Sequence, residues 1–338
     1  MRKISYKYEL LDVNNVHKKW LTGVISANVR IVYLTQIKTT AEINMKDDSE
    51  INYLTDRIKI YMCIDNAEYP IGIFLMSTPS RDITSNTITR NIKLYDLCQI
   101  LIDDKLEQRL VLEKGTNVIA QVKRLLGTWR HTIPDNNGVL AGQKVYDMGE
   151  SKLTVINDLL SCLNYNSLRC DVNGYYVTEA YVEPTAKEID TYYTADENSI
   201  ICSNMTDTLD LFDVPNVFVR YTNAIDNTPL SYTYVNDNEA SMTSTVNRGR
   251  RIVSVESTDA TDIITLAAKT KRAVFDTISS YNKIEFSVQV NEKLLNRFMQ
   301  KVALNIKDIQ DNYIVTSCAF DCRAGATAEL EARKVVLI

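Results

Sequence analysis

The sequence predicts an α+β, β-rich fold: two barrel-like antiparallel β domains with a small α/β unit and helical insertions. Apolar and polar residues alternate over much of the two ends of the chain, as strands with one buried face require. Between them the apolar spacing changes to that of amphipathic helices. With 10 Gly, 6 Pro and no low-complexity stretch, the units are expected to pack together without a flexible linker. The expected domains span residues 1–112, 113–198 and 199–338.

The first β domain is predicted from short alternating runs. Ile58 and Ile60 fall on one face of the run from Tyr53 to Cys63. Two further β-prone runs follow, Ile71 to Leu75 and Thr87 to Leu97. Runs of this length separated by Asp, Asn and Ser turns favour an antiparallel barrel or sandwich.

The small α/β unit is predicted from two helical patterns and a hairpin. The first helix is expected to have its N-cap at Thr116 and to end at Gly127, because apolar positions between them follow one helical face. The second helix begins at Ser151. Asn173 and Gly174 then predict a two-residue hairpin turn, since both residues tolerate positive φ.

The second β domain is expected to contain one long helical insertion around residues 259–279. Asp259 and Asp262 stand near its start, where the helix dipole favours negative charge. The segment from Leu294 to Ile306 fits a helix or a strand, and strands are expected over Tyr313–Ser317 and Ala326–Ile338. The predicted buried face of the helix comprises Ile264, Ala267, Ala268, Val274, Phe275 and Ile278.

The overall charge argues against a protein built to bind nucleic acid. The chain has 38 basic and 43 acidic residues, a net charge of −5, whereas phosphate binding needs dense positive charge. No stretch approaches the roughly 18 apolar residues that span a bilayer, and the N-terminus lacks the apolar core of a signal peptide. We therefore expect synthesis in a cytoplasm and no stable membrane association.

The cysteines predict buried, reduced thiols. There are seven, an odd number, and none forms a CxxC pair. Cys318 and Cys322 have CxxxC spacing but no nearby histidine, so a zinc site is not expected there. No metal ligand, cofactor-binding residue or cofactor is predicted.

The sequence also predicts that the protein is not an enzyme. His17 and His131 have no neighbouring nucleophile or metal-ligand spacing, so packed or surface roles are favoured. The adjacent pair Asp47-Asp48 reads as a solvated turn or the end of an element. No phosphate-binding loop, dinucleotide fingerprint or GxSxG motif occurs, so no catalytic residue is assigned.

Arg248-Gly249-Arg250-Arg251 is the densest basic spot. A solvated turn before the strand that starts at Ile252 is the favoured interpretation. Binding of an acidic partner surface stays open as the alternative, although three charges alone give little affinity.

Several stretches of the chain, taken in their order along the sequence, can be compared with a known protein family. The arrangement resembles the tail hub family of bacteriophages and phage-derived contractile particles (tailocins). That family includes the central baseplate hub protein of contractile tails and the N-terminal region of the tail-associated proteins of flexible tails. The resemblance covers nearly the whole chain and is carried by Asp56–Ile60, Pro70–Leu75, Ile92–Leu97, Val122–Gly127, the helix from Ser151 into Asp171–Tyr175, Asp213–Val217, Asn247–Ile252 and Tyr313–Ser317 with Ala324–Ala326.

The resemblance implies a trimeric adaptor. Two related barrel-like domains per chain would give a homotrimeric ring with pseudo-sixfold symmetry, joining the sixfold tail tube to a threefold spike or fibre around a central channel. The implied partners are the tail tube or distal tail protein, the tape-measure protein, and a spike or fibre protein, with DNA only as transient channel cargo. The implied location is the tail tip or baseplate of a virion or phage-like particle, after synthesis in the bacterial host cytoplasm.

Two other functions remain as alternatives at this stage. A tail-associated cell-wall hydrolase would need acidic or metal-ligand clusters, which the sequence does not reveal. A receptor- or carbohydrate-binding tail module is suggested by the 19 tyrosines, but tyrosine is also a common strand and interface residue.

Overall fold

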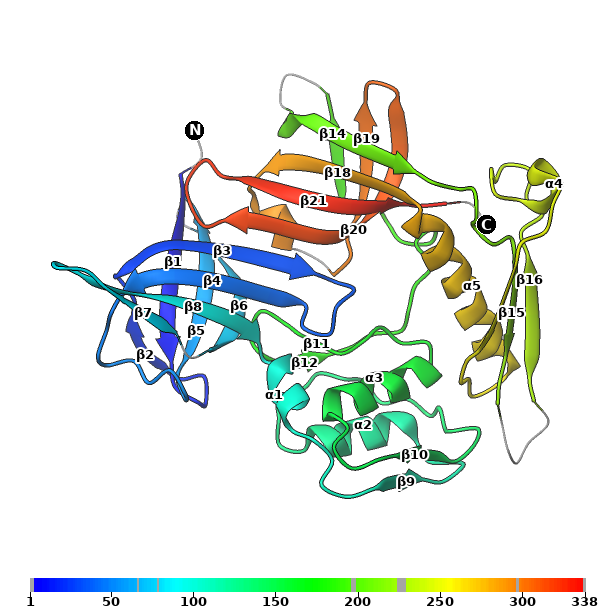
Figure 1. Ribbon diagram of the computed structural model, residues 1–338, viewed down its shortest axis with the longest axis horizontal. Helices are drawn as coiled ribbons and strands as arrows, with labels where there is room; N and C mark the ends of the chain where they lie inside the picture. The colour runs from blue at the N-terminus through cyan, green and yellow to red at the C-terminus, as the bar shows by residue number, and fades with distance from the viewer. Residues whose placement is uncertain are drawn as a thin grey trace.

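The computed structural model describes residues 3–65, 67–77, 79–195, 199–223, 229–295 and 298–336. It is a β-rich α+β fold, as predicted. A 14-stranded, mostly antiparallel sheet runs through the molecule, accompanied by smaller sheets and a few helices (Figure 1).

The first half of the large sheet comes from the N-terminal part of the chain. Its strand order is β3-β4-β8-β6-β5-β1-β2, and β7 adds to β8. Ile58 and Ile60 are fully buried in β5, which confirms the alternation read from the sequence. The strands are β1 Ile4–Leu11, β2 His17–Trp20, β3 Val24–Val32, β4 Thr39–Lys46, β5 Arg57–Ile64, β6 Ala67–Met76, β7 Ser80–Ile83 and β8 Ile88–Asp96.

The second half of the sheet is built mainly from the C-terminal part of the chain. Its order is β14-β18-β21-β20, while β19 pairs with β20 and β13 pairs in parallel with β19. The strands are β13 Thr191–Thr194, β14 Ile201–Leu209, β18 Asn282–Gln289, β19 Lys301–Ile306, β20 Ile309–Asp321 and β21 Thr327–Lys334.

Strand β20 corrects the prediction of two separate barrel-like domains. Its residues 309–314 pair with β19, and residues 317–321 pair with β3 of the first half. A register shift between Val315 and Ser317 lies between the two pairings. Such a bulge redirects a strand, and 13 residues are long enough to serve two neighbours. The halves therefore form one continuous sheet, and no strand pairing among the described residues closes a barrel.

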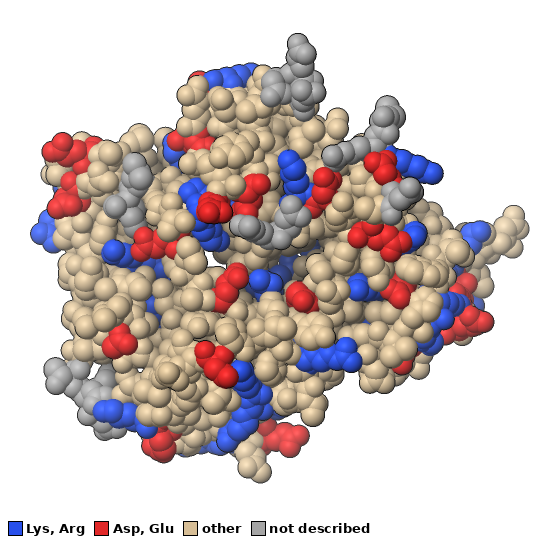
Figure 2. Space-filling view, turned by 180° about the vertical axis from the view of Figure 1, so that it is seen from behind, with Lys and Arg blue, Asp and Glu red and all other residues tan. Residues whose placement is uncertain are grey.

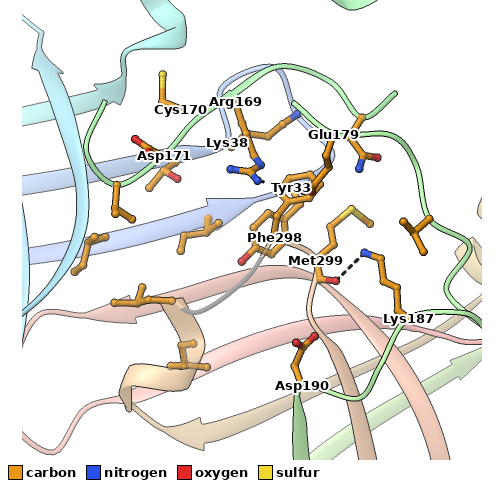
Figure 3. A pocket seen from close by; sticks show the side chains of 18 of the residues that line it. Tyr33, Lys38, Arg169, Cys170, Asp171, Glu179, Lys187, Asp190, Phe298 and Met299 are labelled. Carbon is orange, nitrogen blue, oxygen red and sulfur yellow. Dashed lines mark hydrogen bonds and ion pairs between the residues drawn. The ribbon is translucent and has the colours of Figure 1, made fainter. Parts of the chain in front are cut away.

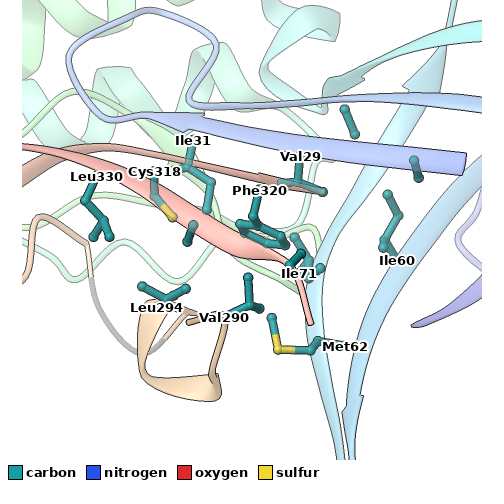
Figure 4. Packing of buried hydrophobic residues seen from close by; sticks show 14 of the residues in the cluster. Val29, Ile31, Ile60, Met62, Ile71, Val290, Leu294, Cys318, Phe320 and Leu330 are labelled. Atoms are coloured by element: carbon teal, nitrogen blue, oxygen red, sulfur yellow. The ribbon is translucent and has the colours of Figure 1, made fainter. Parts of the chain in front are cut away.

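One hydrophobic core is shared by both halves of the sheet. Figure 4 shows Ile31 of β3, Met62 of β5 and Phe320 of β20 packed together. Leu294 reaches the same core from a short 3-10 helix, Glu292–Leu295. Because both halves contribute to one core, they are expected to unfold together.

The small α/β unit has its own core, centred on two helices. Ser151 caps α3 and Gly127 ends α2 with φ 60°, both as predicted. The N-cap of α2 is Asn117 rather than Thr116, because the Asn117 side chain accepts a hydrogen bond from the backbone N–H of Ala120. The elements are α1 Cys98–Asp103, β9 Leu110–Leu112, α2 Val118–Leu126, β10 Lys144–Tyr146, α3 Lys152–Cys162, β11 Arg169–Cys170 and β12 Tyr176–Val177.

A three-stranded sheet and the long helix α5 form the remaining part, at the right of Figure 1. The helix begins at Ile263 with Asp262 as its N-cap, later than predicted. The predicted buried face is wrong at Ile264, which is 79% exposed, because the buried stripe of the helix includes Leu266 and Ile264 lies about 200° away around the helix. The elements are β15 Val217–Tyr221, β16 Ser231–Val235, α4 Thr245–Arg248, β17 Val253–Ser257 and α5 Ile263–Ser280.

The structure also settles the segments that the sequence left ambiguous. The segment 294–306 ends as strand β19, and residues 296 and 297 within it lie outside the described residues. Most of the predicted last strand is β21, while residues 337 and 338 lie outside the described part. No helix among the described residues is long and apolar enough to cross a bilayer. The boundaries after residues 112 and 198 stay predictions.

Candidate functional site

The outer face of the three-stranded sheet presents exposed apolar side chains. Strand β15 pairs with β16 on one edge and with β17 on the other, which places Val219 beside Val255. Phe218 points the opposite way and packs against α5 through Val274 and Ile278. Side chains alternate along a strand, so α5 covers one face and leaves the other open beyond Val217, which is itself buried. We call this open surface the outer valine face; it comprises Val219, Tyr221, Val235, Val253 and Val255.

Two valines of this face are at least half exposed and lie side by side. Val253 is 50% exposed and Val255 is 59% exposed, and they alternate on the same strand. Contiguous apolar surface of this kind marks sites of contact with other proteins more often than isolated exposed residues do. The outer valine face is therefore the candidate interaction surface.

Arginine side chains of the basic segment 248–251 donate hydrogen bonds to backbone carbonyls of a neighbouring loop. Arg248 donates from Nη1 to the carbonyl oxygen of Val214 at 2.6 Å, and Arg250 donates from Nη2 to that of Phe212 at 2.6 Å. The Arg250 guanidinium also lies 4.7 Å from the centre of the Phe212 ring. Two of the three arginines thus bind backbone carbonyls within the chain, a role that neither sequence interpretation included.

The motif Val214-Pro215-Asn216 is fixed beside this loop. Asn216 is fully buried; its side chain donates to the carbonyl of Arg250 and accepts from the N–H of Ile252. These bonds attach the start of β15 to the segment that leads into β17. The motif therefore shapes the sheet that carries the outer valine face.

The predicted hairpin turn exists, but its geometry differs from the prediction. Strands β11 and β12 are joined by residues 171–175, and the N–H of Gly174 donates to the carbonyl of Asp171 at 3.0 Å. Gly174 has φ 80° as expected, whereas Asn173 does not have positive φ. The Asp171 carboxylate accepts the N–H groups of Asn173 and Tyr175. The turn stabilised by the Asp171 side chain replaces the two-residue hairpin turn and gives a longer loop.

The two histidines occupy different environments. His17 lies on β2, where its Nδ1 is 2.7 Å from Glu9 Oε1, and the Tyr61 hydroxyl donates to the other oxygen of Glu9. Trp20 packs beside the His17 ring. His131 forms an isolated bridge with Tyr176 at the edge of the small α/β unit. The structure keeps the two histidines in separate parts of the fold and places His17 in a surface hydrogen bond with Glu9.

A cavity of about 760 Å³ lies between the first half of the sheet and the segment 166–190 (Figure 3). Phe298 packs edge-on against Tyr33, and the Arg169 guanidinium lies 5.0 Å from the centre of the Phe298 ring. Lys187 donates to the carbonyl of Met299. Acidic and basic side chains both line the cavity, so its charge favours neither anions nor cations.

A buried group of Asp96, Cys98 and Cys170 adjoins this cavity. The two sulfur atoms are 3.8 Å apart, and Cys170 lines the cavity wall. Burial raises the pKa of the Asp96 carboxyl, and its backbone hydrogen bonds act in the opposite direction. Burial also raises the pKa of the Cys170 thiol well above its usual value. Sequence analysis did not connect the two cysteines, because 72 residues separate them.

The surface charges are mixed. Figure 2 shows Lys and Arg side chains interspersed with Asp and Glu over the face turned away from the viewer in Figure 1. Many charged side chains of the described residues are paired, as Lys144 is with Asp259 at 2.8 Å. A surface of this kind gives no dense positive patch for nucleic acid on that face.

Comparison with solved structures shows that this fold is shared with phage tail proteins. The chain matches the tail protein from Neisseria meningitidis MC58 with a TM-score of 0.71 at 12% identity, over 97% of this chain and 96% of that one. It matches the prophage MuSo2 43 kDa tail protein from Shewanella oneidensis with a TM-score of 0.66 at 11% identity, over 96% and 98% of the two chains.

A third match comes from a secretion machine. It is a component of the Escherichia coli type VI secretion system that is itself structurally similar to the T4 bacteriophage tail proteins gp27 and gp5. The TM-score is 0.55 at 10% identity, over 94% of this chain and 75% of that one. No protein-family model matches the chain, and no curated protein matches it in sequence. The resemblance inferred from the sequence is therefore confirmed at the level of the fold.

Proposed function

We propose that this chain is the structural hub of a phage-like tail tip or baseplate. In this role it is a homotrimeric adaptor that joins the sixfold tail tube to a threefold spike or fibre around a central channel. The observation that carries the proposal is the fold shared with the tail protein from Neisseria meningitidis over 97% of this chain and 96% of that one. The match to a secretion-system component that resembles gp27 and gp5 supports the hub over other tail positions.

The division of the large sheet into two halves supports a ring with pseudo-sixfold symmetry. Each half contributes several antiparallel strands, and β20 holds them side by side in one chain. Three copies would place six β-rich units around one axis. A closed ring requires head-to-tail contacts between different surfaces of neighbouring subunits.

The outer valine face is suited to such an assembly role. Val235, Val253 and Val255 of this face are exposed in the isolated chain, and contact with a neighbouring tail subunit would remove them from water. Behind this face, Asn216 donates to the carbonyl of Arg250 at the start of β15, and helix α5 covers the opposite side of the sheet. The role is structural and needs no catalytic group or cofactor.

The remaining partners follow from the position at the tail tip. They are the tail tube or distal tail protein above, the tape-measure protein and DNA as transient cargo in the channel, and a spike or fibre protein below. A channel for moving cargo should lack dense positive charge, since tight phosphate binding would stall DNA. The mixed charges of the face in Figure 2 and the net charge of −5 agree with this expectation.

Electron cryo-microscopy of purified particles tests the proposal directly. Antibody or tag labelling of this chain first identifies its density, and the tail tip is then reconstructed without imposed symmetry. We expect three copies around the tail axis, directly below the tube and enclosing a channel. Six copies around the axis, or a position away from the tube, would refute the hub assignment.

A further inference from the structure

The group of Asp96, Cys98 and Cys170 has the composition of a metal site. Asp96 ends β8, Cys98 begins α1 and Cys170 ends β11. One oxygen and two sulfur atoms from these side chains all lie within 4.8 Å of one another. Two thiols and a carboxylate, mostly shielded from solvent, form a ligand set that borderline-soft divalent ions prefer.

The distance between the sulfur atoms fits a tetrahedral ion. Zinc–sulfur bonds of about 2.3 Å at tetrahedral angles place two thiolates about 3.8 Å apart, and the observed separation is 3.8 Å. A disulfide needs about 2.05 Å, so the same pair would have to move much closer to form one. We propose that Asp96, Cys98 and Cys170 form a binding site for zinc or a similar divalent ion.

Asp96 is held in place as a metal-binding carboxylate usually is. Its Oδ2 accepts the backbone N–H groups of Lys38 and Thr39, both at 2.9 Å, and its Oδ1 accepts that of Cys98 at 2.8 Å. Each carboxylate oxygen accepts about two interactions, so Oδ1 keeps one direction for an ion. Fixed partners of this type orient metal ligands and are part of most metal sites.

The charge balance of the site is favourable. A divalent ion with two thiolates and one carboxylate carries two positive charges against three negative ones. Lys38 is 5% exposed; burial lowers the pKa of its ammonium group, while the nearby charges of Cys98 and Asp96 act in the opposite direction. Its ammonium group would offset the remaining negative charge, which lowers the cost of burying the complex.

The cavity beside the group provides access and a fourth ligand. Cys170 and Lys38 both line the cavity of about 760 Å³ (Figure 3). An ion can enter from this side, and a water molecule can complete a site with three protein ligands. Once bound, the ion would connect the end of β8 to the β11–β12 hairpin, two segments that sequence places far apart. The site is independent of the proposed hub role.

Metal titration of the full chain tests this site. Protein is purified under reducing conditions, stripped with a chelator, and titrated with Zn²⁺ or Co²⁺ against a chromophoric competitor. We expect uptake of about one ion per chain, a thiolate-to-cobalt charge-transfer band, and a higher Tm with zinc. Cys98→Ser and Cys170→Ser should lose the uptake and the band. Cys322→Ser, which removes a partly buried thiol outside the group, should keep both.

The outcomes separate clearly. The proposal would be overturned if wild-type protein takes up no more ion than Cys98→Ser. It would also be overturned if Cys98 and Cys170 form a disulfide and the protein still takes up no ion after that disulfide is reduced. If a serine variant fails to fold, X-ray absorption of cobalt-loaded wild type decides. Two sulfur scatterers at about 2.3 Å support the site, and their absence overturns it.

Discussion

Substitution of Gly174 by valine tests how the β11–β12 hairpin is fitted to the rest of the fold. Gly174 has φ 80°, a conformation that β-branched residues strongly disfavour. A Cβ atom at this position would also lie 3.0 Å from Leu97 Cδ1 and 3.3 Å from Ile73 Cδ1. Both neighbours are buried, so neither can move aside freely.

The two effects add to a measurable loss of stability. The left-handed conformation costs a residue with a side chain about 1–2 kcal/mol. Overpacking of a core contact adds about 1–3 kcal/mol. We therefore expect Gly174→Val to lower the free energy of unfolding by about 2–5 kcal/mol.

Gly115 provides a matched control. It has φ 85°, but a Cβ there would meet no atom within 4 Å, so Gly115→Val carries only the backbone cost. Urea unfolding followed by far-ultraviolet circular dichroism and tryptophan fluorescence measures both variants. Gly174→Val should be clearly less stable than Gly115→Val. Equal stability of the two variants would show that Gly174 is not packed against Leu97 and Ile73.

Three further predictions follow from the other sites. His17→Gln with His131→Gln should leave particle assembly and infection or killing intact, and a large loss of activity in normally assembled particles would contradict a structural role. Asp262→Ala should destabilise the chain by about 1 kcal/mol at neutral pH because it removes the α5 N-cap bond to Thr265. That bond lowers the pKa of Asp262, so the carboxylate stabilises the fold fully above its ordinary pKa. In urea titrations, the difference in the free energy of unfolding between wild type and Asp262→Ala should shrink as pH falls through the lowered pKa. Asp262→Asn caps the helix without titrating, so its contribution at this position should not depend on pH. Val255→Asp should reduce incorporation into particles without unfolding the chain, while Ile264→Asp, which alters another exposed apolar residue, should be incorporated normally; equal incorporation of both would remove the outer valine face as a contact.

Local signals in the sequence determined several elements correctly. The helix α3 starts after Ser151 because a serine hydroxyl can accept the backbone N–H of Thr154 three residues later. The buried face of β5 follows from alternation, since successive side chains in a strand point to opposite sides. Both features depend only on residues a few positions apart.

Other local features were decided by competing side chains. Asn173-Gly174 has the composition of a two-residue turn, yet the Asp171 carboxylate accepts two nearby N–H groups and stabilises a longer loop. At the start of α2, Asn117 takes the capping position next to the predicted Thr116. The sequence shows which residues are able to make such bonds, and the packed chain selects among them.

The joining of the two β-rich halves depended on tertiary structure. An alternating pattern reveals that β20 has a buried face but not which strands lie at its edges. Its pairing with β3 brings together residues near the two ends of the chain, such as Phe320 and Val29. The same folding places Cys98 against Cys170 and leaves the valines of β17 uncovered. Sequence periodicity thus determined which faces are apolar, whereas strand partners and shared sites were decided by long-range contacts that no local pattern encodes.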